Sequence, residues 1–226
     1  MKRFRNRAEA GRMLADAVKR LNLDHPVVYA LPRGGAPAGA EIARALGAPL
    51  DLVFVRKLGA PGHGELAIGA VVDGATPQTV LNDEIISALG VSRAQIEDLR
   101  RAALAEIARR RAAFDDALSP VDPRGRSAVI VDDGVATGAT MEASVMALKS
   151  AGAARVIVAA PVMPLEAAAH FRKIADDVVC LETPVPFLAV GAHYDDFRQL
   201  EDRDVIELLS AMNADDEFSR KRRDRQ

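Results

Sequence analysis

The sequence contains little cysteine and few aromatic residues: one cysteine, no tryptophan, two tyrosines and seven phenylalanines among 226 residues. The single cysteine, Cys180, excludes an internal disulfide and fits a reducing compartment. It lies in an apolar run at residues 178–181, which indicates a packed strand thiol rather than a nucleophile. No apolar run approaches the roughly 20 residues that a membrane-spanning helix needs. We therefore expect a cytoplasmic protein without a membrane partner.

The chain also lacks a strong excess of either charge, with 30 Lys and Arg against 32 Asp and Glu and a net charge of −2. This balance gives no general electrostatic reason to bind nucleic acid. The basic N-terminus is followed by an amphipathic helical pattern rather than an apolar signal core, so we expect no secretion. Residues 213–226 are charged throughout and predict a solvated, disordered tail; RNA contact by its basic end is the less favoured interpretation.

Apolar strand patterns and helical patterns alternate along the chain. Strands are predicted at residues 27–31, 52–55, 127–131, 156–160 and 178–181, and helices at residues 7–21, 36–46 and from 138 onward. This order predicts an α/β fold with a mostly parallel central sheet flanked by helices, in a single domain over residues 1–212. Ligands of such sheets bind beyond the carboxyl ends of the strands.

Residues 83–118 form a predicted helical insertion. Ser92 and Gln95 have the spacing of a capping box, and an apolar stripe follows. Arginines at positions 100, 101 and 109–111 alternate with acidic residues, which favours a solvent-facing helix with intrahelical ion pairs over a polyanion-binding surface. The sequence leaves open whether the insertion braces a loop or contacts a second subunit.

Residues 129–140 join a buried strand, two carboxylates and a short turn before a helix. In such a turn the N–H groups and dipole of the helix favour a phosphate, Thr137 and Thr140 add hydroxyl donors, and Gly138 permits close approach. Asp132 and Asp133 cannot bind that phosphate, but carboxylates suit the hydroxyls of a sugar, directly or through a divalent cation. The segment predicts a sugar-phosphate site; an ordinary βα turn is the alternative.

Two more loops follow predicted strands. Pro32-Arg33-Gly34-Gly35 offers a positive charge and adjacent glycines, whose N–H groups can face an oxyanion, although it could be merely a tight turn. Residues 56–69 contain many glycines around one proline and predict a mobile cover. His63 and Glu65 lie in this cover, where a solvated loop position is the more ordinary interpretation of each.

Together, residues 129–140 and the Pro-Arg-Gly-Gly loop resemble the signature regions of the type I phosphoribosyltransferases, which bind phosphoribosyl pyrophosphate (PRPP). Gly134 departs from the aliphatic residue that this family usually has. The resemblance covers about residues 27–197 apart from the insertion. It implies the type I phosphoribosyltransferase fold with a small C-terminal hood at about residues 182–200.

The resemblance implies transfer of the 5-phosphoribosyl group from PRPP to a nitrogenous acceptor, such as a nucleobase, with release of pyrophosphate and with Mg²⁺ as cofactor. Asp132 and Asp133 would hold the ribose and the metal. Glu65 would lie in the flexible catalytic loop, and Arg33 and Lys57 would act on the leaving group. The implied phosphate sites are Ala136, Thr137, Gly138, Ala139 and Thr140 for the 5′-phosphate, and Arg33, Gly34, Gly35 and Lys57 for the pyrophosphate.

The acceptor is the least determined part of the site. In the hood, Phe187 or Tyr194 could stack on a base and Asp195 or Asp196 could accept hydrogen bonds from it, although packing roles are equally expected. Ala136 stands where the 6-oxopurine branch of the family has an Asp, which argues against hypoxanthine or guanine. We expect a homodimer. A PRPP-sensing regulator without turnover is the main alternative, and a hydrolase or phosphorylase of phosphorylated sugars is a third.

Overall fold

The computed structural model describes residues 3–73, 77–114, 117–118 and 120–223, without the side chains of residues 63–65 and 213–223. Within these residues the strands are β1 (Pro26–Ala30), β2 (Leu50–Leu52), β3 (Val55–Ala60), β4 (His63–Val72), β5 (Gln78–Leu81), β6 (Ser127–Val131), β7 (Arg155–Val162) and β8 (Asp177–Glu182). The α-helices are α1 (Arg7–Lys19), α2 (Gly35–Leu46), α3 (Asp83–Leu89), α4 (Arg93–Arg111), α5 (Ala139–Ser150), α6 (Leu165–Ile174) and α7 (Asp202–Arg223).

The main sheet of the described chain has five strands in the order β2-β1-β6-β7-β8, and every neighbouring pair is parallel. This confirms the mostly parallel sheet predicted from the alternation of strands and helices. β6 lies in the middle, where Val129 is opposite Val28 of β1 and Ile157 of β7. All five residues of β6 are buried, as expected for a strand covered on both faces.

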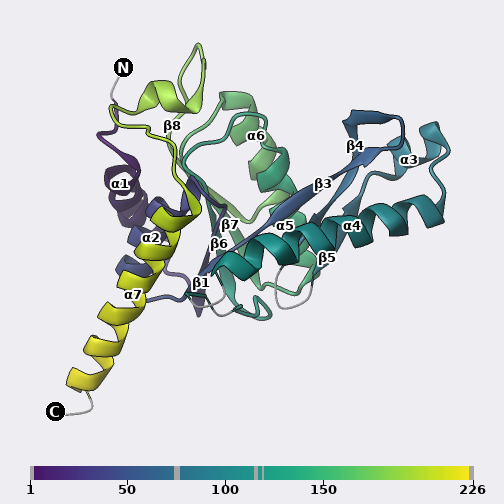
Figure 1. Ribbon diagram of the computed structural model, residues 1–226. Helices are drawn as coiled ribbons and strands as arrows, with labels where there is room; N and C mark the ends of the chain where they lie inside the picture. The colour runs from purple at the N-terminus through teal and green to yellow at the C-terminus, as the bar shows by residue number, and fades with distance from the viewer. Residues whose placement is uncertain (1–2, 74–76, 115–116, 119, 224–226) are drawn as a thin grey trace.

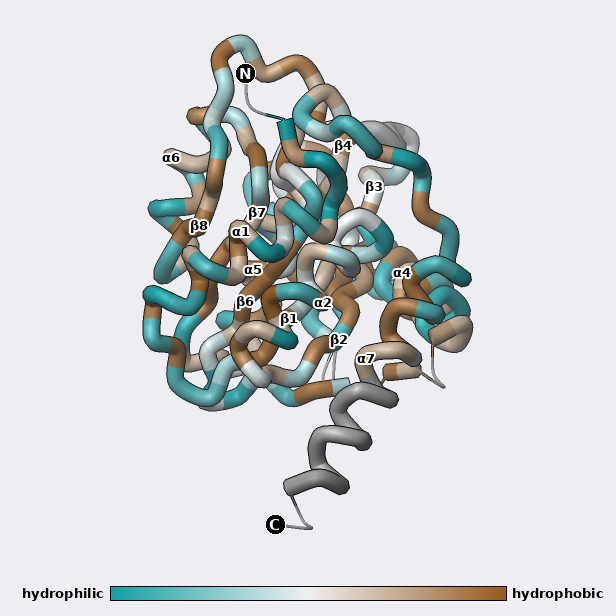
Figure 2. The backbone as a smooth tube through the Cα atoms, turned by 90° about the vertical axis from the view of Figure 1, so that its left-hand side faces the viewer, coloured by the Kyte–Doolittle hydropathy of each residue, from teal (hydrophilic) through white to brown (hydrophobic). Residues whose placement is uncertain are grey.

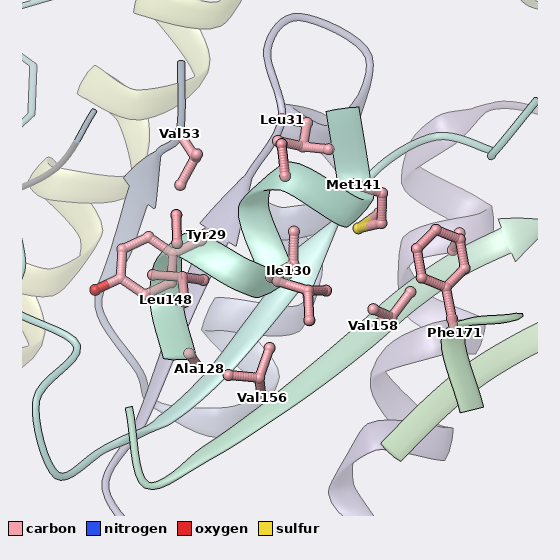
Figure 3. Close-up of a cluster of buried hydrophobic side chains, with 14 of the residues drawn as sticks. Tyr29, Leu31, Val53, Ala128, Ile130, Met141, Leu148, Val156, Val158 and Phe171 are labelled. Carbon is pink, nitrogen blue, oxygen red and sulfur yellow. The ribbon is translucent and has the colours of Figure 1, made fainter. Parts of the chain in front are cut away.

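Helices cover both faces of this sheet. Side chains of α1 and α2, such as Leu14 and Ile42, pack with Val129 on one face. On the other face, Ile130 packs with Leu148 of α5 and Phe171 of α6, as Figure 3 shows. The hydropathy view places the apolar strands β1 and β6 in the interior (Figure 2). The carboxyl ends of β1 and β6 are therefore adjacent, and the loops that follow them meet at one edge.

A second, antiparallel sheet (β3-β4-β5) extends to one side with α3 and α4 (Figure 1). Residues 56–69, predicted as a mobile glycine-rich cover loop, form the β3–β4 hairpin instead, and their movement stays a prediction. Gly62 supplies the left-handed turn (φ +77°), and a Cβ on Gly69 would lie 2.2 Å from the Val80 carbonyl oxygen of β5. The strand predicted at residues 52–55 is divided, because β2 ends at Leu52 and β3 begins at Val55.

The insertion contains α3 and α4, and the predicted capping box at Ser92 and Gln95 is confirmed. Arg100, Arg101 and Arg109 pair with acids three residues earlier on the same helix. The solvent-facing interpretation was wrong for Arg111, whose guanidinium binds the buried carboxylates of Asp51 and Asp73. This ion-pair network fastens the end of α4 to the edge of the main sheet.

The chain ends in α7, whose Val205 and Leu209 pack into the apolar cluster formed with β2, β3, β4 and α4. The tail interpretation concerns residues 213–226, whose side chains lie outside the described residues, as do residues 224–226 entirely. No helix in the described parts of the chain has the length and apolar content to cross a bilayer.

Candidate functional site

The loops after β1 and β6 pack directly against each other. A Cβ on Gly34 would lie 2.3 Å from Oδ2 of Asp133, and a Cβ on Gly35 would lie 2.3 Å from the Val131 carbonyl oxygen. Both glycines are therefore required by the close approach of the two loops, in addition to any role in binding an anion. This contact places the Arg33 loop beside the paired acids, as the sequence predicted for one common site.

Asp133 forms a buried ion pair with Arg7, the first residue of α1, at 2.6 Å from Nε to Oδ2. Nη1 of Arg7 also donates to the Arg198 carbonyl oxygen at 2.9 Å, and the guanidinium carbon lies 3.9 Å from the centre of the Phe197 ring. Sequence reasoning missed Arg7, because nothing in the local pattern distinguishes it from the neighbouring basic residues. Arg7 connects the N-terminus, the acidic pair and the hood.

Asp132 is half-buried, and its Oδ1 accepts a hydrogen bond of 2.8 Å from the backbone N–H of Asp133. Burial and the neighbouring Asp133 carboxylate raise the pKa of Asp132 well above its usual range. Burial also raises the pKa of Asp133, although the Arg7 guanidinium acts in the opposite direction. Such a pair is stabilised in its ionised form by hydroxyl donors or by a cation between the carboxylates.

The predicted phosphate-binding turn leads into α5, a 12-residue helix with Gly138 at its N-cap. Gly138 has a left-handed conformation (φ +79°), and a Cβ there would lie 3.0 Å from Cζ of Phe171. Ala136, Thr137, Ala139 and Thr140 are exposed. The first N–H groups of α5 lack intrahelical partners and open to solvent, as binding of a phosphate requires.

Arg33 is held by the start of α7. Its Nε lies 2.8 Å from Oδ1 of Asp202, and its Nη1 donates to the Leu200 carbonyl oxygen at 2.7 Å. The peptide bond between Pro32 and Arg33 is cis. The guanidinium of Arg33, which we predicted to bind pyrophosphate, is therefore paired with Asp202 within the chain. The sequence did not indicate this pair.

The acidic pair, Arg7 and Arg33 line an open cleft of about 600 Å³. Its lining combines three arginines, two acids, two further residues of the loop after β1 and the C-terminal end of the hood: Arg7, Pro32, Arg33, Gly34, Arg110, Asp132, Asp133, Phe197, Gln199 and Leu200. The cleft confirms that residues distant in sequence converge on the acidic pair. Arg110 of the insertion was not among the predicted site residues.

Lys57 is not part of this lining. It is exposed on β3, opposite Ala70 of β4. The structure therefore does not bring Lys57 together with Arg33 in the cleft. The side chains of His63 and Glu65 lie outside the described residues, so their predicted placement rests on the sequence alone.

The hood packs on the signature turn. A Cβ on Gly134 would lie 2.4 Å from Cγ1 of Val190, so Gly134 replaces the usual aliphatic residue to make room for the hood. Phe187 is half-buried and stacks on His193 with ring centres 5.8 Å apart. Nε2 of His193 is buried and has no hydrogen-bond partner within the described part of the chain.

The predicted stacking role of Tyr194 was wrong. Its ring is 1% exposed and packs between Phe4 and Phe197, and its hydroxyl donates to the Asp133 carbonyl oxygen at 2.6 Å. Tyr194 therefore supports the backbone of the acidic pair. Asp195 is exposed and pairs with Arg3, with 3.3 Å between Oδ1 and Nε.

Comparison with known proteins gives a consistent set of similarities. Residues 5–196 match the family model described as the phosphoribosyl transferase domain. A protein of Mycobacterium tuberculosis strain H37Rv, provisionally named a phosphoribosyl transferase, is 42% identical over 215 residues, which cover 95% of this chain and 48% of that protein. The chain thus spans about half the length of the curated relatives that it matches.

Two solved structures are similar over nearly the whole chain. The crystal structure of TT1426 from Thermus thermophilus has a TM-score of 0.82 and 41% identity, covering 92% of this chain and 97% of that one. A hypothetical protein from Neisseria gonorrhoeae with bound ppGpp has a TM-score of 0.50 and 15% identity, covering 93% and 97%. At that identity the second similarity concerns the fold alone.

Proposed function

Because the chain belongs to the phosphoribosyl transferase domain family, we propose that it transfers the 5-phosphoribosyl group from PRPP to a nitrogenous acceptor and releases pyrophosphate. One observation carries this proposal. Asp132 and Asp133 line the same cleft as Arg33 and Gly34, and the chain leads from them through a short exposed turn into the amino end of α5. A sugar whose hydroxyls face the acids would have its 5′-phosphate at the helix and its diphosphate near the arginine loop.

In this reaction the bond from C1′ to the diphosphate oxygen breaks, its electron pair leaves on that oxygen, and the acceptor nitrogen forms a new bond to C1′. The transition state resembles an oxocarbenium ion, so the main requirement is to stabilise the departing polyanion. Arg33 would supply charge to the diphosphate, with hydrogen bonds from the backbone of Gly34 and Gly35. Lys57, which does not line the cleft, would reach the substrate after a movement of the β3–β4 hairpin, which would also exclude water, and Glu65 stays a proposed catalytic residue of the same hairpin.

The acids fit a magnesium ion that is held mainly by the substrate. Within the described residues no group of three or more His, Cys, Asp or Glu is placed to hold a metal. Mg²⁺ typically keeps several waters and binds one or two carboxylates together with phosphate oxygens. The carboxylate of Asp132 and Oδ1 of Asp133, which does not pair with Arg7, are suitable ligands for this ion. When bound, the ion would neutralise charge on the diphosphate and the ribose oxygens.

We place the acceptor against the hood. Phe187 offers a half-buried ring, and His193 beside it has an unpartnered buried nitrogen among the described residues. Exposed Asp195 stays a proposed acceptor contact. Ala136 provides no carboxylate to act as a base on a 6-oxopurine, which favours an acceptor that is nucleophilic without such help. We also propose a cytoplasmic homodimer.

The proposal is tested by a panel of nucleobases and related nitrogen compounds, incubated with PRPP, Mg²⁺ and the full chain, with pyrophosphate release as the readout. Release that depends on one acceptor supports the transferase. Asp132→Asn is the matched control and should lose most of that release without unfolding. Calorimetric binding of PRPP without release across the panel would favour a PRPP-sensing protein, and absence of PRPP binding at millimolar ligand would exclude both.

A further inference from the structure

Helix α4 ends in three consecutive arginines that have three different surroundings. Arg109 is exposed and pairs with Glu106 through two hydrogen bonds of 2.7 and 3.0 Å. Arg111 faces inward and binds Asp51, 2.6 Å away, and Asp73. Successive helical residues point about 100° apart. Arg110 therefore points between the directions of Arg109 and Arg111, and it lines the cleft.

Arg110 faces an aromatic ring rather than an acid. Its guanidinium carbon lies 5.5 Å from the centre of the Phe54 ring, which is itself 1% exposed. The neighbouring Arg111 network fixes the backbone at this point. In the described parts of the chain, Arg110 forms no ion pair, because Glu106, one turn earlier, is engaged by Arg109. A half-buried guanidinium at the cleft therefore keeps its charge available to a ligand.

The other arginines of the cleft are already matched by internal acids: Arg7 by Asp133, and Arg33 by Asp202. A diphosphate carries several negative charges, more than Arg33 alone can balance, and Lys57 does not line the cleft. Guanidinium groups suit phosphate oxygens because their N–H donors form a planar fork. Mg²⁺ and Arg33 would supply part of the balancing charge, and Arg110, which lines the same cleft as Arg33 and Gly34, is available to supply more.

We propose that Arg110, from the helical insertion, binds the diphosphate group of the donor together with Arg33 and Gly34. This inference rests on the proposed function and gives the insertion a part in substrate binding. Arg110 would then contact only the diphosphate, which is the leaving group. Substitution of Arg110 should not change the affinity for ribose 5-phosphate, which lacks the diphosphate.

The test is calorimetric titration of the full chain with inorganic pyrophosphate and Mg²⁺, with PRPP and Mg²⁺, and with ribose 5-phosphate. Arg110→Gln should weaken binding of pyrophosphate and PRPP about ten-fold or more, as expected for loss of a charged hydrogen bond, and leave ribose 5-phosphate unchanged. Arg101→Gln is the matched control: it removes the same charge from an exposed position of the same helix, where Arg101 pairs with Asp98, and should leave all three affinities within about two-fold of the wild type.

Unchanged pyrophosphate binding in Arg110→Gln would overturn the inference, as would an equal loss in Arg101→Gln, because general electrostatics would then explain the effect. Arg110→Lys keeps the charge but not the fork, so an intermediate affinity is expected, and this variant carries the test if the Gln variant does not fold. A wild-type chain that binds neither PRPP nor pyrophosphate overturns the proposed function and this inference together. Wild-type PRPP binding with an unaffected Arg110→Gln overturns the inference alone.

Discussion

Asp202 competes with the proposed substrate for Arg33. The two side chains are partly exposed and form an ion pair of 2.8 Å, but Oδ1 of Asp202 has no aligned hydrogen bond within the described residues. An incoming diphosphate would have to replace this carboxylate. Because exposed ion pairs contribute about 0.2–1 kcal/mol, we predict that Asp202→Asn tightens pyrophosphate binding by roughly two- to five-fold.

Glu201→Gln is the control for this experiment, since Glu201 precedes Asp202 directly and pairs with Arg203 instead. It removes the same charge without touching Arg33. Calorimetry with pyrophosphate and Mg²⁺ should separate the two variants. Equal affinities in both would show that the Arg33–Asp202 pair does not limit access of the anion.

Single residues also show which parts of the site a sequence can reveal. Asp132 and Asp133 directly follow β6, Arg33 lies in the loop after β1 and Gly138 precedes α5, so their positions at one edge could be inferred from local pattern and parallel topology. Arg7 and Asp202 reach the same place only through packing of α1 and α7, and neither has a local signal. The prediction for Tyr194 failed for the opposite reason. An aromatic residue in a predicted loop is expected to be accessible to a ligand, but Phe4 and Phe197 pack against its ring.

The helical insertion is joined to the main sheet by one buried charge network. Arg111 of α4 binds Asp51 of β2 and Asp73, and also donates to the Leu52 carbonyl oxygen at 3.1 Å. Burial raises the pKa of Asp73 to about 6, although the Arg111 guanidinium opposes this. We predict that Arg111→Met lowers the free energy of unfolding by about 3–5 kcal/mol at pH 8, because it leaves two buried carboxylates without a cation.

This loss should shrink as the pH falls. Because the folded-state pKa of Asp73 is above its unfolded value of 3.8, its stabilising contribution is complete below about pH 4 and is lost as the pH rises through about 6. Removing Arg111 raises the folded-state pKa further, so the variant suffers most at high pH and recovers toward pH 5. Urea unfolding at pH 5 and pH 8 measures the difference, with Arg109→Met as the control. A loss independent of pH would contradict the charge explanation.

At the scale of elements, the spacing of apolar residues predicted helices and strands correctly, whereas glycine content predicted a loop incorrectly. The buried strand β6 and the helices α1 and α2 were predicted within one or two residues, because apolar spacing determines them. The glycine content of residues 56–69 suggested a loop. In the structure, Gly69 instead permits the close approach of β4 to the Val80 carbonyl oxygen of β5, and Gly62 forms the tight turn of the β3–β4 hairpin. Glycine marks close backbone approach as well as irregular structure.

At the scale of the whole molecule, the cleft is assembled from segments that are far apart in the sequence. Its lining comes from α1, the loops after β1 and β6, the insertion and the C-terminal end of the hood, and Figure 1 shows how these elements are arranged. The same regions share apolar clusters, since α4 and α7 pack together with β2 and β3. Ligand binding and global stability should therefore be coupled, because the complete site exists only in the folded chain.

That coupling gives a prediction for the unfolding of the whole chain. A ligand that binds only the folded state at about 100 times its Kd adds about 2.7 kcal/mol to the free energy of unfolding, or roughly 1 M in the urea midpoint. We expect PRPP with Mg²⁺ to produce this shift at about 25 °C in a single transition. Asp132→Asn, which loses a cleft carboxylate without breaking an ion pair and removes its repulsion with Asp133, should unfold at or above the wild-type midpoint without ligand and shift much less with it. An unshifted wild-type midpoint would mean that PRPP does not bind the folded chain, whereas equal shifts in both proteins would place the ribose away from Asp132.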